Sequence, residues 1–184
     1  MGRSKSPPAA PGFGSRVHFW VLGLCLVSLW CLLGRYWGLQ HDAQLYVLQA
    51  LGRLQPAIFA EDLFLRFAGK AKLTLFPLVS SAVVGTFGPA RGAALATLLM
   101  HAFWFGAAWL LIRRLMSRDL ALLSFGLIVV IPIGYGSGQV FRLVEPFFSA
   151  RPLAEALSFV ALAALVSQRR ILAAVFAVMA VSIH

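Results

Sequence analysis

Long apolar runs recur along this chain from Val17 to the last residue, and only short charged breaks separate them. Hydrophobic residues make up 60% of the sequence, charged residues make up 12%, and the mean hydropathy is +0.85. Runs of this length and frequency are typical of helices that cross a lipid bilayer. The sequence therefore predicts an integral membrane protein and excludes a soluble one.

The net charge of +10 does not indicate a nucleic-acid-binding protein. Such a protein would gather its Lys and Arg residues on one soluble face, whereas here they punctuate the apolar runs. This distribution is typical of loops that lie against an anionic membrane surface. We therefore expect membrane lipid as a partner and no nucleic acid.

The apolar runs predict an all-α, polytopic transmembrane protein with about five spans and with interfacial helices in its first outer loop. We expect residues 1–16 to form a disordered cytoplasmic tail and residues 17–184 to form the transmembrane domain. Several of the expected spans are shorter than the ~20 residues that a bilayer requires, so their boundaries are soft. The spans are expected at 17–33, 90–112, 120–133, 153–166 and 171–184.

The segment 73–88 is also apolar, and it could either cross the membrane or only dip into it. If it crosses, six Lys and Arg residues lie inside and ten outside, which opposes the positive-inside rule. If it dips, eight lie on each side and five of the six acids lie outside. We therefore expect a dipping helix and a cytoplasmic amino terminus.

The hexapeptide His41-Asp42-Ala43-Gln44-Leu45-Tyr46 directly follows the first expected span. An ionisable residue where a helix leaves lipid is by default a candidate for function, which makes Asp42 a candidate catalytic acid. The alternative is that Asp42 only satisfies the free amide groups at a helix start. His41 is weaker evidence and is typical of a residue at headgroup level.

The residues from Asp42 to Leu54 predict an amphipathic helix in the membrane interface. At 100° per residue, one stripe is polar and the opposite face is apolar, so that face is expected to enter the outer leaflet. The polar stripe consists of Asp42, Tyr46, Gln49 and Arg53, and the apolar face consists of Val47, Leu48, Leu51 and Leu54.

Two adjacent acids, Glu61 and Asp62, follow after Gln55-Pro56 ends this helix. They cannot face the same way on a helix, so we expect Asp62 either to join Asp42 near a substrate or metal or to cap a short helix. Glu61 is expected to be solvated or to pair with Arg66.

The second outer loop is expected at 134–152. Its glycines do not match a phosphate-binding loop and predict a flexible turn. Arg142 and Arg151 are candidate phosphate ligands, because a guanidinium offers two donors to a phosphate at once, and the alternative for both is headgroup contact. Glu145 is the acid of this loop, and Glu155 is expected to favour the start of the next helix.

The order of these features resembles the GT-C membrane glycosyltransferases: an inner tail, one span, an outer loop that opens with Asp42-x-x-x-Tyr46, an amphipathic helix, a dipping helix and further spans. The resemblance covers essentially the whole chain, and especially 42–64 and 145–157, where the chain looks like uncharacterised bacterial members. It implies a bacterial inner-membrane enzyme that transfers a sugar from a polyprenyl phosphate donor.

The resemblance also implies roles for individual residues. Asp42 would act as base or metal ligand near the acceptor, and Glu145 and Arg151 would lie near the lipid phosphate. A divalent metal ion is the expected cofactor, with Asp42 and Glu145 as ligands. The substrate-binding residues expected on this basis are Tyr46, Asp62, Glu145, Arg151 and His184.

Two other functions stay open at this point: a transporter or channel fragment, and a non-catalytic membrane assembly protein. A transporter would favour ionisable residues near the middle of the membrane, where His101 is the main polar group expected. Members of the GT-C class usually have more spans, so we expect this chain to be the front part of a longer protein and inactive alone.

Overall fold

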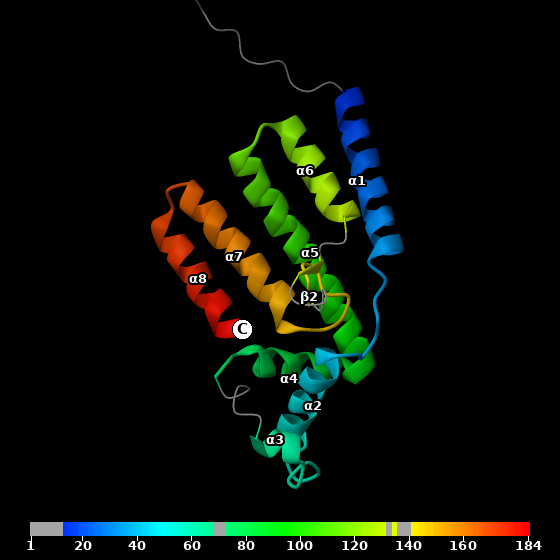
Figure 1. Cartoon of the computed structure of the whole chain (residues 1–184), viewed down its shortest axis with the longest axis vertical. Coiled ribbons are helices and arrows are strands. Elements are labelled where there is room, and N and C mark those ends of the chain that lie inside the picture. Colours follow the sequence, from blue (N-terminus) through cyan, green and yellow to red (C-terminus); the bar gives the residue numbers. More distant parts are fainter. Residues whose placement is uncertain (1–12, 68–72, 132–133, 136–140) are drawn as a thin grey trace, which may run out of the picture.

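The computed structural model describes residues 13–67, 73–131, 134–135 and 141–184, and nearly all of the regular structure in these ranges is helical (Figure 1). This confirms the predicted helical class. The helices are α1 (Phe13–Leu33), α2 (Asp42–Leu54), α3 (Leu63–Phe67), α4 (Phe76–Phe87), α5 (Pro89–Leu115), α6 (Arg118–Val130), α7 (Ala150–Val166) and α8 (Arg170–Ile183). Two short antiparallel strands, β1 (Gly134–Tyr135) and β2 (Phe141–Arg142), lie between α6 and α7.

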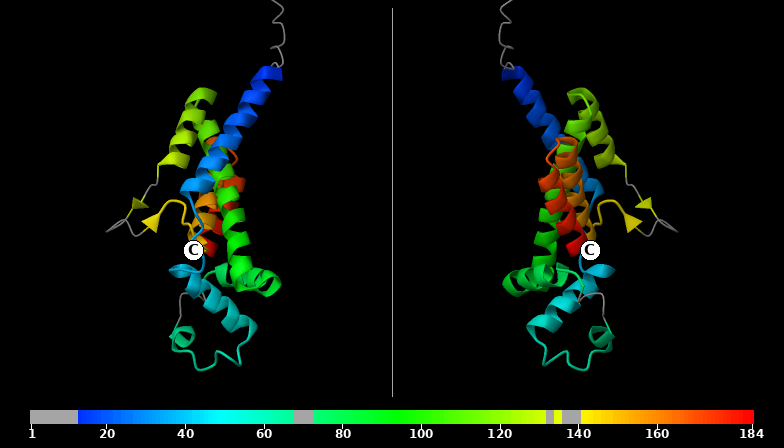
Figure 2. Two further views of the ribbon diagram at one scale, coloured as in Figure 1. Left: turned by 90° about the vertical axis from the view of Figure 1, so that its right-hand side faces the viewer. Right: turned by 90° about the vertical axis from the view of Figure 1, so that its left-hand side faces the viewer.

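The long helices α5, α7 and α8 pack side by side, and α6 and α1 lie beside the other flank of α5 (Figures 1 and 2). Their buried faces are rich in alanine, which lets helix backbones approach closely. Trp104 of α5 is fully buried and packs at 5.2 Å between ring centres against Phe159 of α7. The contact between α5 and α7 therefore combines small residues with one large aromatic pair.

Helices α2 and α4 pack together at one end of this bundle (Figure 1). Helix α4 lies across the end of the bundle, and Gly88, with φ of 77°, separates it from α5 (Figures 1 and 2). The two helices meet closely at Gly92. A Cβ atom added to this residue would lie only 2.9 Å from the backbone oxygen of Val83. Only a glycine fits at this contact without a shift.

Among the described residues, one helix is long and apolar enough to cross a membrane, namely α5. Shorter apolar helices include 21–33 of α1, α4 and α8. Helix α4 has 12 residues, which corresponds to a length of about 18 Å and is less than the hydrocarbon thickness of a bilayer.

The ends of the bundle differ in charge. The start of α1, the turn between α5 and α6 and the turn between α7 and α8 lie together at one end, opposite α2 and α4 (Figure 1). The two turns carry the basic residues Arg113, Arg114, Arg118, Arg169 and Arg170.

Two boundaries predicted from the sequence need correction. Residues 13–16 belong to α1 and not to a disordered tail, while residues 1–12 lie outside the described residues. The second loop ends earlier than predicted, since α7 begins at Ala150, and strands β1 and β2 stand at the flanks of the expected glycine turn. The middle of that turn, 136–140, also lies outside the described residues.

The orientation of α2 also differs from the prediction. Its buried residues are Ala43, Val47 and Ala50, which pack with α4 residues such as Phe76 and Val84 in one core cluster. Val47 was expected on a face that enters lipid, but it is 5% exposed. The reason is that α4 provides an apolar partner, so burial within the protein decides which face turns inward.

Candidate functional site

Glu145 carries a buried carboxylate and forms a polar group with Ser149 and Arg151, close to α2. Its residue is 3% exposed, and both of its carboxylate oxygens accept hydrogen bonds, one from the Ser149 hydroxyl and one from the Arg151 guanidinium. Burying a carboxylate is costly unless such partners are present. The segment that leads into α7 is therefore organised around this side chain.

The chain positions these partners through the start of α7. Ser149 is the residue before the helix, and Arg151 is its second residue. The Ser149 hydroxyl does not cap the helix but donates to Glu145 instead. Arg151 is half-buried and forms a charge-assisted bond of the kind that is stronger than a neutral one.

Asp42, in the first loop, lies close enough to this group for its charge to act on it. It is the first residue of α2, and its charge raises the pKa of both Glu145 and Tyr46. No hydrogen bond to the Asp42 carboxylate is found in the part of the chain that the structure describes. His41, just before it, has φ of 48°, a region that residues other than glycine adopt rarely and that is often associated with function.

Tyr46 fixes α2 against the start of α7. Its ring packs against Phe76 at 4.7 Å and against Phe148 at 6.5 Å between ring centres. Burial is the main cause that raises the pKa of Tyr46, and the charges of Asp42 and Glu145 raise it further. A hydrogen bond with the backbone of Ala150 opposes this rise. Tyr46 is only partly buried, and the sequence did not predict that its ring packs against this aromatic cluster.

Burial also raises the pKa of Glu145 above its ordinary value. The hydrogen bond from Ser149 and the positive charge of Arg151 lower it again in part, whereas the negative charge of Asp42 adds to the rise. The direction of the shift shows that desolvation outweighs the ion pair. Acids whose pKa is shifted by burial and by nearby charges are frequent at functional sites.

Two hydrogen bonds, one from α5 and one from the first loop, hold the backbone around Glu145. Nε2 of His101, a buried residue of α5, lies 2.7 Å from the backbone oxygen of Glu145. The Trp37 amide, in the first loop, donates to the backbone oxygen of Pro146 at 2.9 Å. His101 therefore links α5 to the loop that carries Glu145.

Sequence reasoning missed the part played by Glu155. The indole N–H of Trp104 donates to its carboxylate at 2.8 Å, and its charge is also coupled to Glu145 and Arg151. The sequence predicts only that Glu155 favours a helix start. Its position one turn after Arg151 on the same helix is the signal that could have placed it beside Glu145.

Asp62 and His184 are the other predicted substrate-binding residues. The Asp62 carboxylate accepts a hydrogen bond of 2.9 Å from the Leu65 amide and caps the short helix α3, which was the structural alternative. Glu61 pairs at 3.8 Å with Arg66, as expected, and both side chains are exposed. His184 is an exposed residue that directly follows α8, and its role in substrate binding stays a prediction.

The predicted metal site would have two acids as its ligands. Within the described ranges, no group of three His, Cys, Asp or Glu side chains is placed to hold a metal ion. Asp42 and Glu145 are the two predicted ligands, and both oxygens of Glu145 already accept bonds from Ser149 and Arg151. Metal binding stays a prediction.

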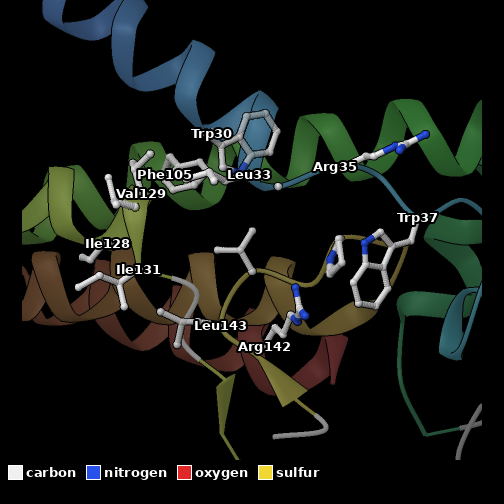
Figure 3. A pocket seen from close by; sticks show the side chains of 14 residues that line it. Trp30, Leu33, Arg35, Trp37, Phe105, Ile128, Val129, Ile131, Arg142 and Leu143 are labelled. Carbon is white, nitrogen blue, oxygen red and sulfur yellow. The ribbon is translucent and has the colours of Figure 1, made fainter.

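A cavity of about 280 Å³ lies beside this polar group, between the end of α1, α5, the end of α6 and the segment after β2 (Figure 3). Trp37 and Pro146 line it, whereas Asp42, Glu145 and Arg151 do not. The cavity and the group formed by Glu145 and Arg151 are therefore neighbours and not the same place. We base the candidate site on the acids, because the chemistry resides in their side chains.

Comparisons with protein-family models, curated proteins and solved structures found no match to this chain.

Proposed function

We propose that this chain belongs to a membrane glycosyltransferase that moves a sugar from a polyprenyl phosphate donor to an acceptor on the extracytoplasmic face. The observation that carries the proposal is the meeting of Asp42 with the pair Glu145 and Arg151. These residues come from two loops that are far apart in the sequence, and they lie at one end of the helical bundle.

The membrane arrangement that we propose has five spans, α1, α5, α6, α7 and α8, with α4 dipping into the outer leaflet. It is supported by the many large apolar side chains that these helices expose. It is also supported by the five arginines at the end of the bundle opposite α2 and α4, because basic residues concentrate on the cytoplasmic side. The amino terminus then lies in the cytoplasm of a bacterial cell, and the candidate site faces outward.

In the proposed reaction, Asp42 accepts the proton of an acceptor hydroxyl. The hydroxyl oxygen forms a bond to the anomeric carbon while the bond from that carbon to the phosphate oxygen breaks. The sugar is transferred and the polyprenyl phosphate leaves with the electron pair. Arg151, which Glu145 orients, stabilises the departing phosphate, and general-base help of this kind is worth roughly 10²- to 10⁴-fold in rate.

The full-length protein that contains this chain can be tested in membrane vesicles with farnesyl-phosphate-linked hexoses as donors and a membrane extract as the source of acceptor. Mass spectrometry would follow the release of farnesyl phosphate. We expect Asp42→Asn to lower the rate by roughly 10²-fold or more. Asp62→Asn is the matched control, because asparagine keeps the helix cap and the residue lies outside the site.

The outcome that contradicts the proposal is normal transfer by an Asp42→Asn protein that is present at its usual level. Equal losses in the Asp42 and Asp62 variants would also contradict it, because they would indicate a general effect of charge in the first loop.

One observation favours a transporter as the second candidate function. His101 and Glu155 are polar side chains within the helical bundle, and both are connected to the segment around Glu145. Ionisable residues inside spans often mark a transport path. Substrate flux into vesicles without any release of farnesyl phosphate would favour this function over the transferase.

A further inference from the structure

A small cavity lies at the end of the bundle opposite α2, where α5 ends beside the turn between α7 and α8 (Figure 1). Its volume is about 70 Å³, which is the space of roughly two water molecules and suits one small group such as a phosphate. Ala163 and Ala164, both buried, line its inner side, and no acid is among the described residues that line it. The cavity can therefore receive one anion but not a whole substrate.

Two arginines line this cavity, Arg114 in the last turn of α5 and Arg169 directly before α8. Both side chains are exposed, and neither forms an ion pair with an acid in the part of the chain that the structure describes. A guanidinium can give two parallel hydrogen bonds to the oxygens of one phosphate. Two guanidiniums at one small cavity therefore favour a phosphate as the anion.

The turn between α7 and α8 fixes the place from which Arg169 extends. The amides of Gln168 and Arg169 donate to the backbone oxygens of Leu165 and Ala164, each at 2.9 Å, and Gln168 has φ of 60°. This is the Schellman type of helix ending, in which the residue with positive φ is usually glycine. A glutamine in this conformation is strained, and such strain is found most often at functional positions.

Apolar side chains lie beside the arginines, on the side towards the middle of the bundle. Leu110 is one helical turn before Arg114 on α5, and Leu172 lies shortly after Arg169 on α8. Both leucines line the cavity, and they are 40% and 41% exposed. In the proposed membrane arrangement, the arginines lie at headgroup level on the cytoplasmic side and the leucines lie deeper, at the level of the acyl chains. An anion that carries hydrocarbon chains therefore suits these walls better than a free phosphate does.

We propose that this cavity binds the phosphate of one acidic phospholipid from the cytoplasmic leaflet, with Arg114 and Arg169 as its ligands. Basic pockets between spans on the cytoplasmic side bind acidic headgroups in this way. The inference rests on the proposed membrane arrangement and not on the transferase reaction. It differs from a general attraction of arginines to an anionic surface, because it assigns the binding to two of the five arginines at this end of the bundle.

Native mass spectrometry can test the inference with the full-length protein that contains this chain, released from a neutral maltoside detergent. The probes are phosphatidylglycerol, phosphatidylcholine and inorganic phosphate, each titrated separately. We expect phosphatidylglycerol to bind about tenfold or more tightly than phosphatidylcholine, because the choline group brings a positive charge towards two guanidiniums. Inorganic phosphate should bind more weakly than phosphatidylglycerol, because it lacks chains that contact Leu110 and Leu172.

The double substitution Arg114→Gln with Arg169→Gln should weaken the binding of phosphatidylglycerol by about tenfold or more, because hydrogen bonds to a charged group are lost. Arg113→Gln with Arg170→Gln is the matched control. It removes the same charge from the neighbouring positions, and neither of these exposed arginines lines the cavity. The control should keep most of the affinity.

Thermal unfolding in the same detergent would check that each variant is folded. If the Gln variant is not folded, Arg114→Lys with Arg169→Lys keeps both charges but loses the two-donor geometry. That variant should bind phosphatidylglycerol severalfold more weakly than the unaltered protein does.

Three results would overturn the inference: equal affinity for phosphatidylglycerol and phosphatidylcholine, an equal loss in the two Gln variants, or binding of inorganic phosphate as tight as that of phosphatidylglycerol. An equal loss would show that only the total charge of this end attracts the lipid. Sugar transfer plays no part in this measurement. Failure of the lipid site therefore leaves the transferase proposal as it stands, and a normal rate in Asp42→Asn leaves the lipid site as it stands.

Discussion

At the scale of single residues, the buried Glu145 carboxylate decides how the two loops meet. It holds the start of α7 through Ser149 and Arg151, and its backbone is tied to α5 through His101. A buried pair of this kind is weak evidence for added stability, but removing one partner leaves an uncompensated charge. The consequences of removing Arg151 and Glu145 therefore differ from each other.

The substitution Arg151→Met should destabilise the protein by about 3 to 5 kcal/mol, because it leaves the Glu145 charge buried without its partner. Adding Glu145→Gln in the same chain should restore much of this loss, since the unpaired charge is then gone. Thermal unfolding in detergent would measure both variants. Arg53→Met is the control for loss of an exposed arginine, and a loss there equal to that of Arg151→Met would contradict the role of the pair.

The raised pKa of Glu145 predicts a particular dependence of stability on pH. Between the ordinary pKa of 4.5 and the raised value, the folded protein holds a proton that the unfolded chain has released. The contribution to stability is therefore fully present below pH 4.5 and is lost as the pH rises through the raised pKa. Glu145→Gln should flatten this decline in a series of unfolding midpoints, and an equally steep decline in the variant would show that Glu145 is not its source.

At the scale of elements, the sequence predicted helix positions well and contacts poorly. The ends of α2 at Asp42 and Leu54 agree with the predicted helix, because Gln55-Pro56 stops it and the apolar period is clear. The buried face of α2 could not be predicted, since it depends on α4 as a partner. The pairing of Arg151 with Glu145 was also not predicted, because both residues suited a phosphate site equally well in sequence.

The close contact between α4 and α5 predicts opposite effects for two glycines of the same helix. A Cβ atom at Gly92 would meet the backbone of Val83 at 2.9 Å, so Gly92→Ala should cost about 1 to 3 kcal/mol through overpacking. Gly106 has nothing within 4 Å of such an atom, so Gly106→Ala should be neutral or should stabilise by up to about 1 kcal/mol. Unfolding midpoints of the two variants provide the comparison, and equal effects would contradict the packing of α4 on α5.

At the scale of the whole molecule, every proposed role depends on which end of the bundle faces the outside of the membrane. The five helices that we propose as spans begin and end near the positions expected from the apolar runs, because hydrophobic length is a strong local signal. The direction of each span is a weaker signal that only the charge distribution provides. Asp42, Glu145 and Arg151 form one outward-facing site only if α4 does not cross the membrane.

Labelling of single cysteines in intact cells tests this central claim most directly. Cysteines would be introduced at Gln40, beside Asp42, and at Ser117, between α5 and α6, after Cys25 and Cys31 are replaced; all four positions are exposed. A membrane-impermeant thiol reagent should label position 40 and should label position 117 only after the cells are opened. Labelling of position 117 in intact cells would place α4 across the membrane and would contradict a site shared by the two loops.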